Sequence, residues 1–149
     1  MEWERYDIEE GGDGQTYYFN SDGPNGIIRK TVRFQHWPKF GQNVFNLFLG
    51  DYEESMDRAN DSIVSNNRDY KVILNSVAWC IDKFVNSHPQ AIFLIRGSTA
   101  SRSRFYQMGI SSRWLEIKER YDIWGRQANK WSPFEKGVNY EEFLVFKKI

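Results

Sequence analysis

The segment 68–87 carries the clearest helical pattern in this chain of 149 residues. Its apolar side chains recur at steps of three and four residues, and its polar ones fall on the other side. Asn66 or Asn67 is suited to cap its start, because a short amide side chain accepts an N–H that the first turn leaves unpaired. Pro89 ends the pattern, because proline cannot continue a helix. The segment therefore predicts one long amphipathic helix that must pack on another layer. Its apolar series is Tyr70, Ile73, Leu74, Val77, Ile81 and Phe84.

Short segments that favour strands surround this helix. Residues 27–35 alternate between apolar and charged side chains, which is typical of a half-buried antiparallel strand. The glycine- and asparagine-rich residues 20–26 predict a turn, and the acid-rich residues 51–67 a loop with a little helix. Together these patterns predict a single α+β domain over 1–149, with a largely antiparallel sheet packed on the long helix. Further strands are expected at 3–9, 16–19, 43–49, 91–95, 121–125 and 142–148, with an irregular loop at 127–137.

A glycine and two hydroxyl residues follow the predicted strand 91–95. Ser98 or Thr99 is suited to cap a short helix over 99–108, and Gly109 to end it. A second helix is expected from Ser111 or Ser112 to residue 120. A strand, a tight turn and a helix start in this order leave backbone N–H groups exposed, and such groups bind anions readily.

This helical corner is also basic. No Asp or Glu occurs from Lys83 through Leu115, whereas four arginines do. Because the whole chain carries 20 basic and 20 acidic residues, the positive field is local. We expect a phosphate-containing ligand here, such as a nucleotide or nucleic acid, or else an acidic protein partner. The alternative is a solvated basic helix with a structural cap, because a Gly-Ser-Thr turn lacks the spacing of a P-loop. The candidate ligand-binding residues are Arg96, Ser98, Thr99, Arg102 and Arg104, with Asn66 and Asn67 from the start of the long helix.

Three segments resemble the signature of a small bacterial family of unknown function, common in Bacteroidota. They are Gly97-Ser98-Thr99-x-x-Arg102-x-Arg104-x-Tyr106-x-x-x-Ile110, Asn66-Asn67-x-Asp69-x-x-Val72-Ile73-Leu74 and Asn139-Tyr140-x-x-Phe143-Leu144-Val145. Members of that family often carry glycine where this chain has Arg68. The resemblance implies one α/β domain in which these three segments form the site.

The order of the predicted elements is similar to that of GNAT-type acetyltransferases. In that fold the turn before the long helix holds the pyrophosphate of the cofactor through glycine-rich backbone, yet residues 64–69 contain no glycine here. The same similarity makes Tyr106 a candidate general acid. A degenerate acyltransferase or other transferase is therefore the second hypothesis. The third is an interaction protein from a two-gene bacterial module.

Other classes of site lack support in the sequence. The two histidines, His36 and His88, are not spaced as metal ligands, and the acidic segment does not match an EF-hand. The single cysteine, Cys80, is expected to be a packed thiol. With no apolar leader at the N-terminus and no long apolar run, we expect a cytoplasmic protein without membrane contact. No cofactor is indicated. Aromatic residues that would stack on RNA bases if exposed, but pack in the core by default, are Tyr17, Tyr18, Phe19, Trp37, Tyr106 and Trp131.

Overall fold

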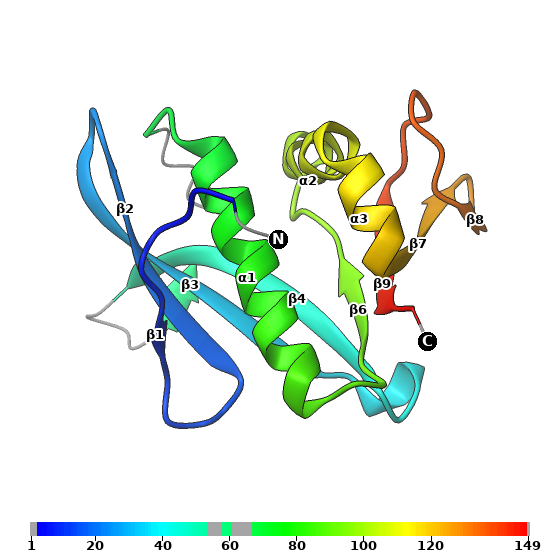
Figure 1. Ribbon diagram of the computed structural model, residues 1–149, viewed down its shortest axis with the longest axis horizontal. Coiled ribbons are helices and arrows are strands. Elements are labelled where there is room, and N and C mark those ends of the chain that lie inside the picture. The colour runs from blue at the N-terminus through cyan, green and yellow to red at the C-terminus, as the bar shows by residue number, and fades with distance from the viewer. Residues whose placement is uncertain (1–2, 54–57, 61–66, 149) are drawn as a thin grey trace. The chain divides into compact units, whose positions relative to one another are not determined.

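A computed structural model describes residues 3–53, 58–60 and 67–148 (Figure 1). Asn66 and most of the acidic segment therefore lie outside the described residues. The chain divides into two compact units. Unit 1 comprises residues 1–35 and 48–87, and unit 2 comprises residues 36–47 and 88–149.

The elements confirm the α+β class with a largely antiparallel sheet. Hydrogen-bonded strands follow the order β1-β2-β3-β4-β6-β9-β7-β8, and β5 pairs with β4. Strands β4 and β6 are parallel, whereas β1–β2, β2–β3, β4–β5, β6–β9, β7–β9 and β7–β8 are antiparallel. The bounds are β1 Glu9–Glu10, β2 Thr16–Gly23, β3 Gly26–His36, η1 Pro38–Phe40, β4 Val44–Glu53, β5 Arg58–Asn60, α1 Tyr70–Ser87, β6 Ile92–Ile95, α2 Ala100–Ser112, α3 Trp114–Arg120, β7 Tyr121–Gln127, β8 Lys130–Pro133 and β9 Glu142–Lys147.

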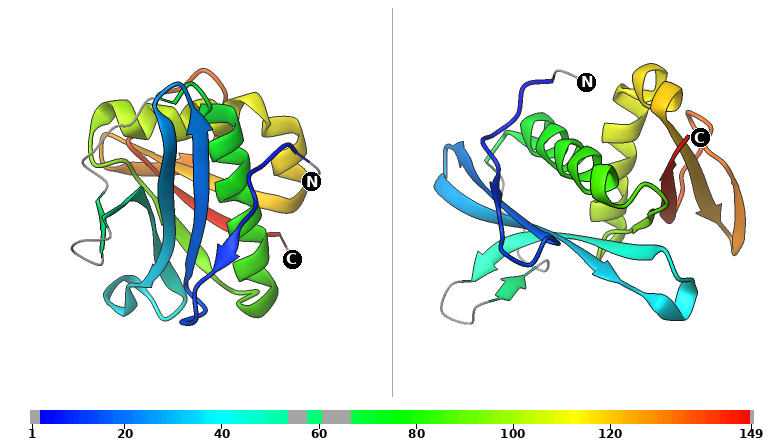
Figure 2. Two further views of the ribbon diagram at one scale, coloured as in Figure 1. Left: turned by 90° about the vertical axis from the view of Figure 1, so that its left-hand side faces the viewer. Right: turned by 60° about the horizontal axis from the view of Figure 1, so that its bottom comes forward.

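In unit 1 the long helix α1 packs on the strands as predicted, and both views in Figure 2 show it beside β2 and β3. Phe84 of α1 stacks on Phe34 of β3, with ring centroids 4.5 Å apart. Cys80 is fully buried, in keeping with a packed thiol, and burial raises the pKa of that thiol. The helix begins at Tyr70 and not at residue 68. The reason is that Arg68 has φ +57°, a left-handed conformation that a right-handed helix cannot include.

The strands of unit 1 differ from the predicted ones at their ends. Strand β2 continues to Gly23, so the predicted turn at 20–26 shrinks to the two residues between Gly23 and Gly26. Residues 51–53 and 58–60, predicted as loop, pair as strands. The predicted strand at 3–9 is wrong except for Glu9. The chain before it is held by α1 instead, because Asn75 Nδ2 donates to the Glu4 carbonyl at 2.8 Å.

Unit 2 also departs from the prediction in its turns. Helix α2 runs through Gly109 to Ser112, and α3 begins at Trp114. The Ser112 hydroxyl donates to the Gly109 carbonyl at 3.0 Å and does not cap α3. The loop predicted at 127–137 contains β8, which forms a hairpin with β7 through Ala128 and Asn129. The core of this unit includes Phe93, Ile95, Tyr121, Ile123, Phe134, Phe143 and Val145.

None of the helices in the described ranges is long and apolar enough to cross a membrane.

Candidate anion-binding site at the start of α2

Thr99 caps α2, as the sequence predicts. Its Oγ1 accepts a hydrogen bond from the Arg102 backbone N–H at 3.2 Å, and its carbonyl accepts one from the Ser103 N–H at 3.1 Å. The first turn contains no acidic residue. The positive end of the helix dipole therefore meets no carboxylate within its own first turn.

Gly97 packs directly against this turn. Its backbone N–H donates to the buried Ser103 Oγ at 3.0 Å. A Cβ at position 97 would lie 2.3 Å from the Ser103 nitrogen and 2.4 Å from the Arg102 Cβ. Only a residue without a side chain allows that approach. The glycine thus fixes how β6 turns into α2.

The remaining polar side chains of the corner face outward. Arg96, Ser98, Thr99 and Arg104 are exposed, and Arg102 is half-buried. Arg113 is the fourth arginine of residues 83–115, which contain no Asp or Glu. Its Nη1 lies 3.9 Å from the Glu116 Oε1. The structure therefore brings five of the predicted ligand residues to the start of one helix.

Arg96 also contacts an aromatic surface that sequence reasoning did not connect with it. Its guanidinium carbon lies 5.1 Å from the centroid of the Trp37 ring, within cation–π range. Trp37 in turn lies 5.3 Å from the ring of Phe40, which is 62% exposed. Trp37 was among the sequence candidates for base stacking, but nothing in the sequence indicated that Arg96 lies over it.

Tyr106, the candidate general acid, is mostly buried. The residue is 7% exposed and contacts the Phe105 ring edge to face, with centroids 5.7 Å apart. Little of this residue is accessible to a substrate. Its packing in α2 is a sufficient reason for an aromatic residue at this position.

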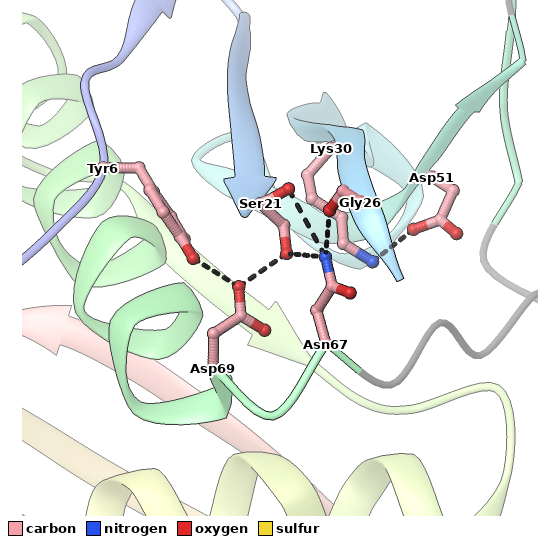
Figure 3. Close-up of polar contacts among 7 residues, drawn as sticks. All are labelled: Tyr6, Ser21, Gly26, Lys30, Asp51, Asn67 and Asp69. Atoms are coloured by element: carbon pink, nitrogen blue, oxygen red, sulfur yellow. Dashed lines mark hydrogen bonds and ion pairs between the residues drawn. The ribbon is translucent and has the colours of Figure 1, made fainter. Parts of the chain in front are cut away.

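Asn67 lies in unit 1 and has a structural role there (Figure 3). It is 3% exposed, and its Nδ2 donates to the Gly26 carbonyl at 2.9 Å and to the Ser21 Oγ at 3.1 Å. Its Oδ1 accepts from the Asn25 N–H at 2.8 Å. Both polar atoms of the amide are therefore engaged in holding the β2–β3 hairpin.

Asp69 extends this network to the N-terminal segment. Its Oδ2 accepts from the Ser21 and Tyr6 hydroxyls, each at 2.5 Å. The Tyr6 oxygen accepts from the Asp22 N–H at 3.1 Å. Burial, together with the hydrogen bond to Asp69, raises the pKa of the Tyr6 phenol above its ordinary value. The segment from Asn67 to Asp69 therefore joins α1 to the strands through polar contacts.

A buried ion pair lies in the same unit. Lys30 of β3 pairs with Asp51 of β4, and both side chains are almost completely buried (Figure 3). Asp51, the first carboxylate of the acid-rich residues 51–67, therefore pairs within unit 1.

The third segment of the resemblance packs in unit 2. The Tyr140 N–H donates to Gln107 Oε1 at 2.9 Å, and the Gln107 Nε2 donates to the Val138 carbonyl. The Tyr140 ring covers Gly125, where a Cβ would lie 2.3 Å from the ring. Tyr140 is buried. This segment therefore packs next to α2, and its tyrosine is not exposed to a ligand.

Charge is divided unequally between the two units. Unit 2 contains twelve of the 20 Lys and Arg residues and six of the 20 Asp and Glu residues, a formal charge of +6. Unit 1 contains the other eight and fourteen, a charge of −6. The neutral total conceals this division, which favours anionic ligands on unit 2.

Across the part of the chain that the structure describes, His, Cys, Asp and Glu do not form a group of three or more that could hold a metal ion. The model of a family of unknown function, DUF6934, matches residues 2–148. No curated protein matches the chain, and no solved structure does.

Proposed function

We propose that this chain, which belongs to the DUF6934 family of unknown function, binds a phosphate-bearing ligand at the start of α2. The observation that carries the proposal is the coincidence of a capped helix start with outward-facing arginines and no acidic residue in the first turn. Backbone N–H groups of a first turn and guanidinium groups both favour phosphate oxygens. The ligand set is Arg96, Ser98, Thr99, Arg102 and Arg104.

Asn67 is not part of this set. Its amide has protein partners on both polar atoms. The division of charge between the units favours unit 2, because a unit of +6 attracts a polyanion more strongly than a unit of −6.

Titration calorimetry with pyrophosphate, ATP and polyphosphate tests the proposal. We expect binding that weakens steeply with salt and that Arg104→Gln reduces severalfold. Lys118→Gln is the matched control, because Lys118 is an exposed cation of α3 in the same unit. No binding of any of the three anions, or equal losses in the two variants, contradicts the proposal.

One observation favours the acyltransferase alternative. Strands β4 and β6 pair in parallel over Val44–Asn46 and Ile92–Leu94, and the long helix α1 connects them in sequence. The burial of Tyr106 and the engaged Asn67 count against a live catalytic site of that kind. This alternative requires that acetyl-CoA raise the melting temperature of the wild type and that Tyr106→Phe lose acetyl transfer while keeping that thermal shift.

A different observation favours the interaction alternative. Strand β8 is an exposed strand whose Trp131 is 38% exposed, and Trp124 on the paired strand β7 is 37% exposed. Exposed tryptophans are enriched at protein interfaces. A partner that copurifies with wild type and not with Trp131→Ser is the result expected from this alternative.

A further inference from the structure

The surface next to the proposed anion site is aromatic and basic. The 3₁₀ turn η1 contains no buried residue, and its Phe40 ring is 62% exposed. Lys39 Nζ lies 6.0 Å from the centroid of that ring. Pro38 at the start of the turn restricts its backbone. Phe40 lies against the half-buried Trp37, so the two rings form a contiguous exposed aromatic patch, and such patches mark interaction sites.

Arg96 joins this surface to the start of α2. The residue directly precedes Gly97, and its guanidinium lies over Trp37, itself 5.3 Å from Phe40. Unit 2 therefore carries a continuous series of contacts. It runs from Lys39 and Phe40 through Trp37 to Arg96, which precedes the turn into α2. We name the group of Trp37, Lys39, Phe40 and Arg96 the stacking surface.

Acidic residues are absent from the sequence around the stacking surface. No Asp or Glu occurs from Gly23 through Gly50, nor from Lys83 through Leu115. The contact between Trp37 and Arg96 brings together one residue from each of these two acid-free stretches. A polyanion placed there meets no carboxylate from either stretch.

We propose that the stacking surface binds single-stranded nucleic acid. Bases stack on Phe40 and Trp37, and phosphates contact Arg96 and the start of α2. Flat rings beside cations suit this ligand, because every base offers a π-face and every nucleotide a phosphate. A paired duplex hides its base faces within the stack, so the single strand is the form that the rings recognise. The inference rests on the proposed function and specifies its ligand class.

Fluorescence anisotropy with labelled 12-nucleotide oligomers tests it. The probes are single-stranded RNA, single-stranded DNA, the corresponding duplex, an abasic oligomer of the same length, and unlabelled polyphosphate as competitor. We expect the oligomers with bases to bind at least tenfold more tightly than the abasic one, since the abasic oligomer has no base to stack on the rings. Equal affinity for RNA and DNA indicates that stacking alone recognises the bases. A preference for RNA indicates an additional contact to the 2′-hydroxyl. Both outcomes support the inference.

Variants separate the inference from the proposed function. Phe40→Ala and Trp37→Leu are expected to weaken binding of the base-containing oligomers about tenfold. Phe40→Ala should leave polyphosphate binding unchanged, whereas Trp37→Leu is not used for that comparison because the Trp37 ring contacts Arg96 of the anion site. Leu115→Ala is the matched control, because Leu115 is 70% exposed on α3 of the same unit. A melting curve checks that Trp37→Leu folds, and Phe40→Ala removes a ring that is mostly in solvent.

If the abasic and base-containing oligomers bind equally, or if Phe40→Ala has no effect, the inference is overturned while anion binding stands. A labelled polyglutamate peptide is the last probe. If it binds as tightly as RNA, the ligand is an acidic protein and the inference is likewise overturned. If no polyanion binds, the proposed function fails together with the inference.

Discussion

Asn67 Nδ2 donates to the Gly26 carbonyl at 2.9 Å, so a buried amide before α1 holds the far end of the β2–β3 hairpin. We expect Asn67→Ala to lower the free energy of unfolding by about 2–3 kcal/mol, because it removes a buried partner from several polar groups at once. Urea denaturation measures the change. Asn86→Ala, at an exposed position of α1, is the control and should shift stability by less than about 0.5 kcal/mol. A similar small shift in Asn67→Ala contradicts the structural role of the network.

Gly97→Ala tests the close approach of β6 to α2. The new Cβ would lie 2.3 Å from the Ser103 nitrogen, which is backbone and cannot easily move aside. We expect a loss of about 1–3 kcal/mol in the free energy of unfolding. The matched control is Gly12→Ala, since a Cβ at Gly12 meets no atom within 4 Å. If both variants are equally stable, the packing of Gly97 on the first turn is wrong.

The buried pair of Lys30 and Asp51 predicts a non-additive result. Lys30→Met alone leaves a buried carboxylate without this partner and should cost about 3–5 kcal/mol. The double variant Lys30→Met/Asp51→Leu should recover most of that loss, because no buried charge remains at the pair. Thermal and urea unfolding of both variants measure the difference. Glu116→Gln, in the exposed pair with Arg113, is the control and should cost less than about 1 kcal/mol. Additive losses at Lys30 and Asp51 argue against coupling.

Asp13 predicts a dependence of stability on pH. Partial burial would raise the pKa of its carboxyl. Hydrogen bonds from the Gln15 N–H, the Thr16 N–H and the Thr16 hydroxyl, at 2.9, 2.9 and 2.7 Å, outweigh that effect and lower the pKa below the ordinary value. The stabilisation is therefore present above the unfolded pKa of about 3.9 and is lost as the pH falls through the lower folded pKa.

The measurement for Asp13 is urea unfolding at several pH values. The difference in free energy of unfolding between wild type and Asp13→Asn should be largest near pH 7 and should shrink below about pH 4. Glu119→Gln, on the exposed side of α3, controls for the loss of one negative charge. A difference for Asp13→Asn that is constant with pH shows that the carboxylate does not stabilise the turn.

Local patterns were sufficient to predict most helices and strands. The apolar period of α1 and the cap at Thr99 depend on neighbouring residues, and the structure confirms both. The errors arise where tertiary contacts outweigh local preference. Gly109 does not end α2, because burial of Tyr106 and Ile110 on either side of it favours a continued helix. The β7–β8 hairpin was missed because its turn places Ala128, a residue that does not favour positive φ, at +49°.

The candidate site could be predicted only in part from the sequence. The arginines and hydroxyls around Gly97 are close in the chain, so their gathering at one helix start could be predicted. The contact of Arg96 with Trp37 joins distant residues through the pairing of β4 with β6, and no local pattern specifies it. The hydrogen bonds of Asn67 to the β2–β3 hairpin could not be predicted either, because the partners are equally remote in sequence.

Arg68 adopts a left-handed backbone conformation just before α1. Its φ of +57° is one that glycine adopts without steric cost. An arginine at this φ therefore costs some conformational energy relative to glycine at the entry to α1.

The division of the chain into units has a practical consequence for dissecting the protein. Each unit is assembled from two separate stretches, because residues 36–47 interrupt the first and residues 48–87 separate the parts of the second. No single truncation therefore yields unit 1 or unit 2 intact. A cut at the boundary between residues 47 and 48 would also divide strand β4. Deletion mapping is thus the wrong tool for assigning ligand binding to one half, and point substitutions in the uncut polypeptide are the appropriate one.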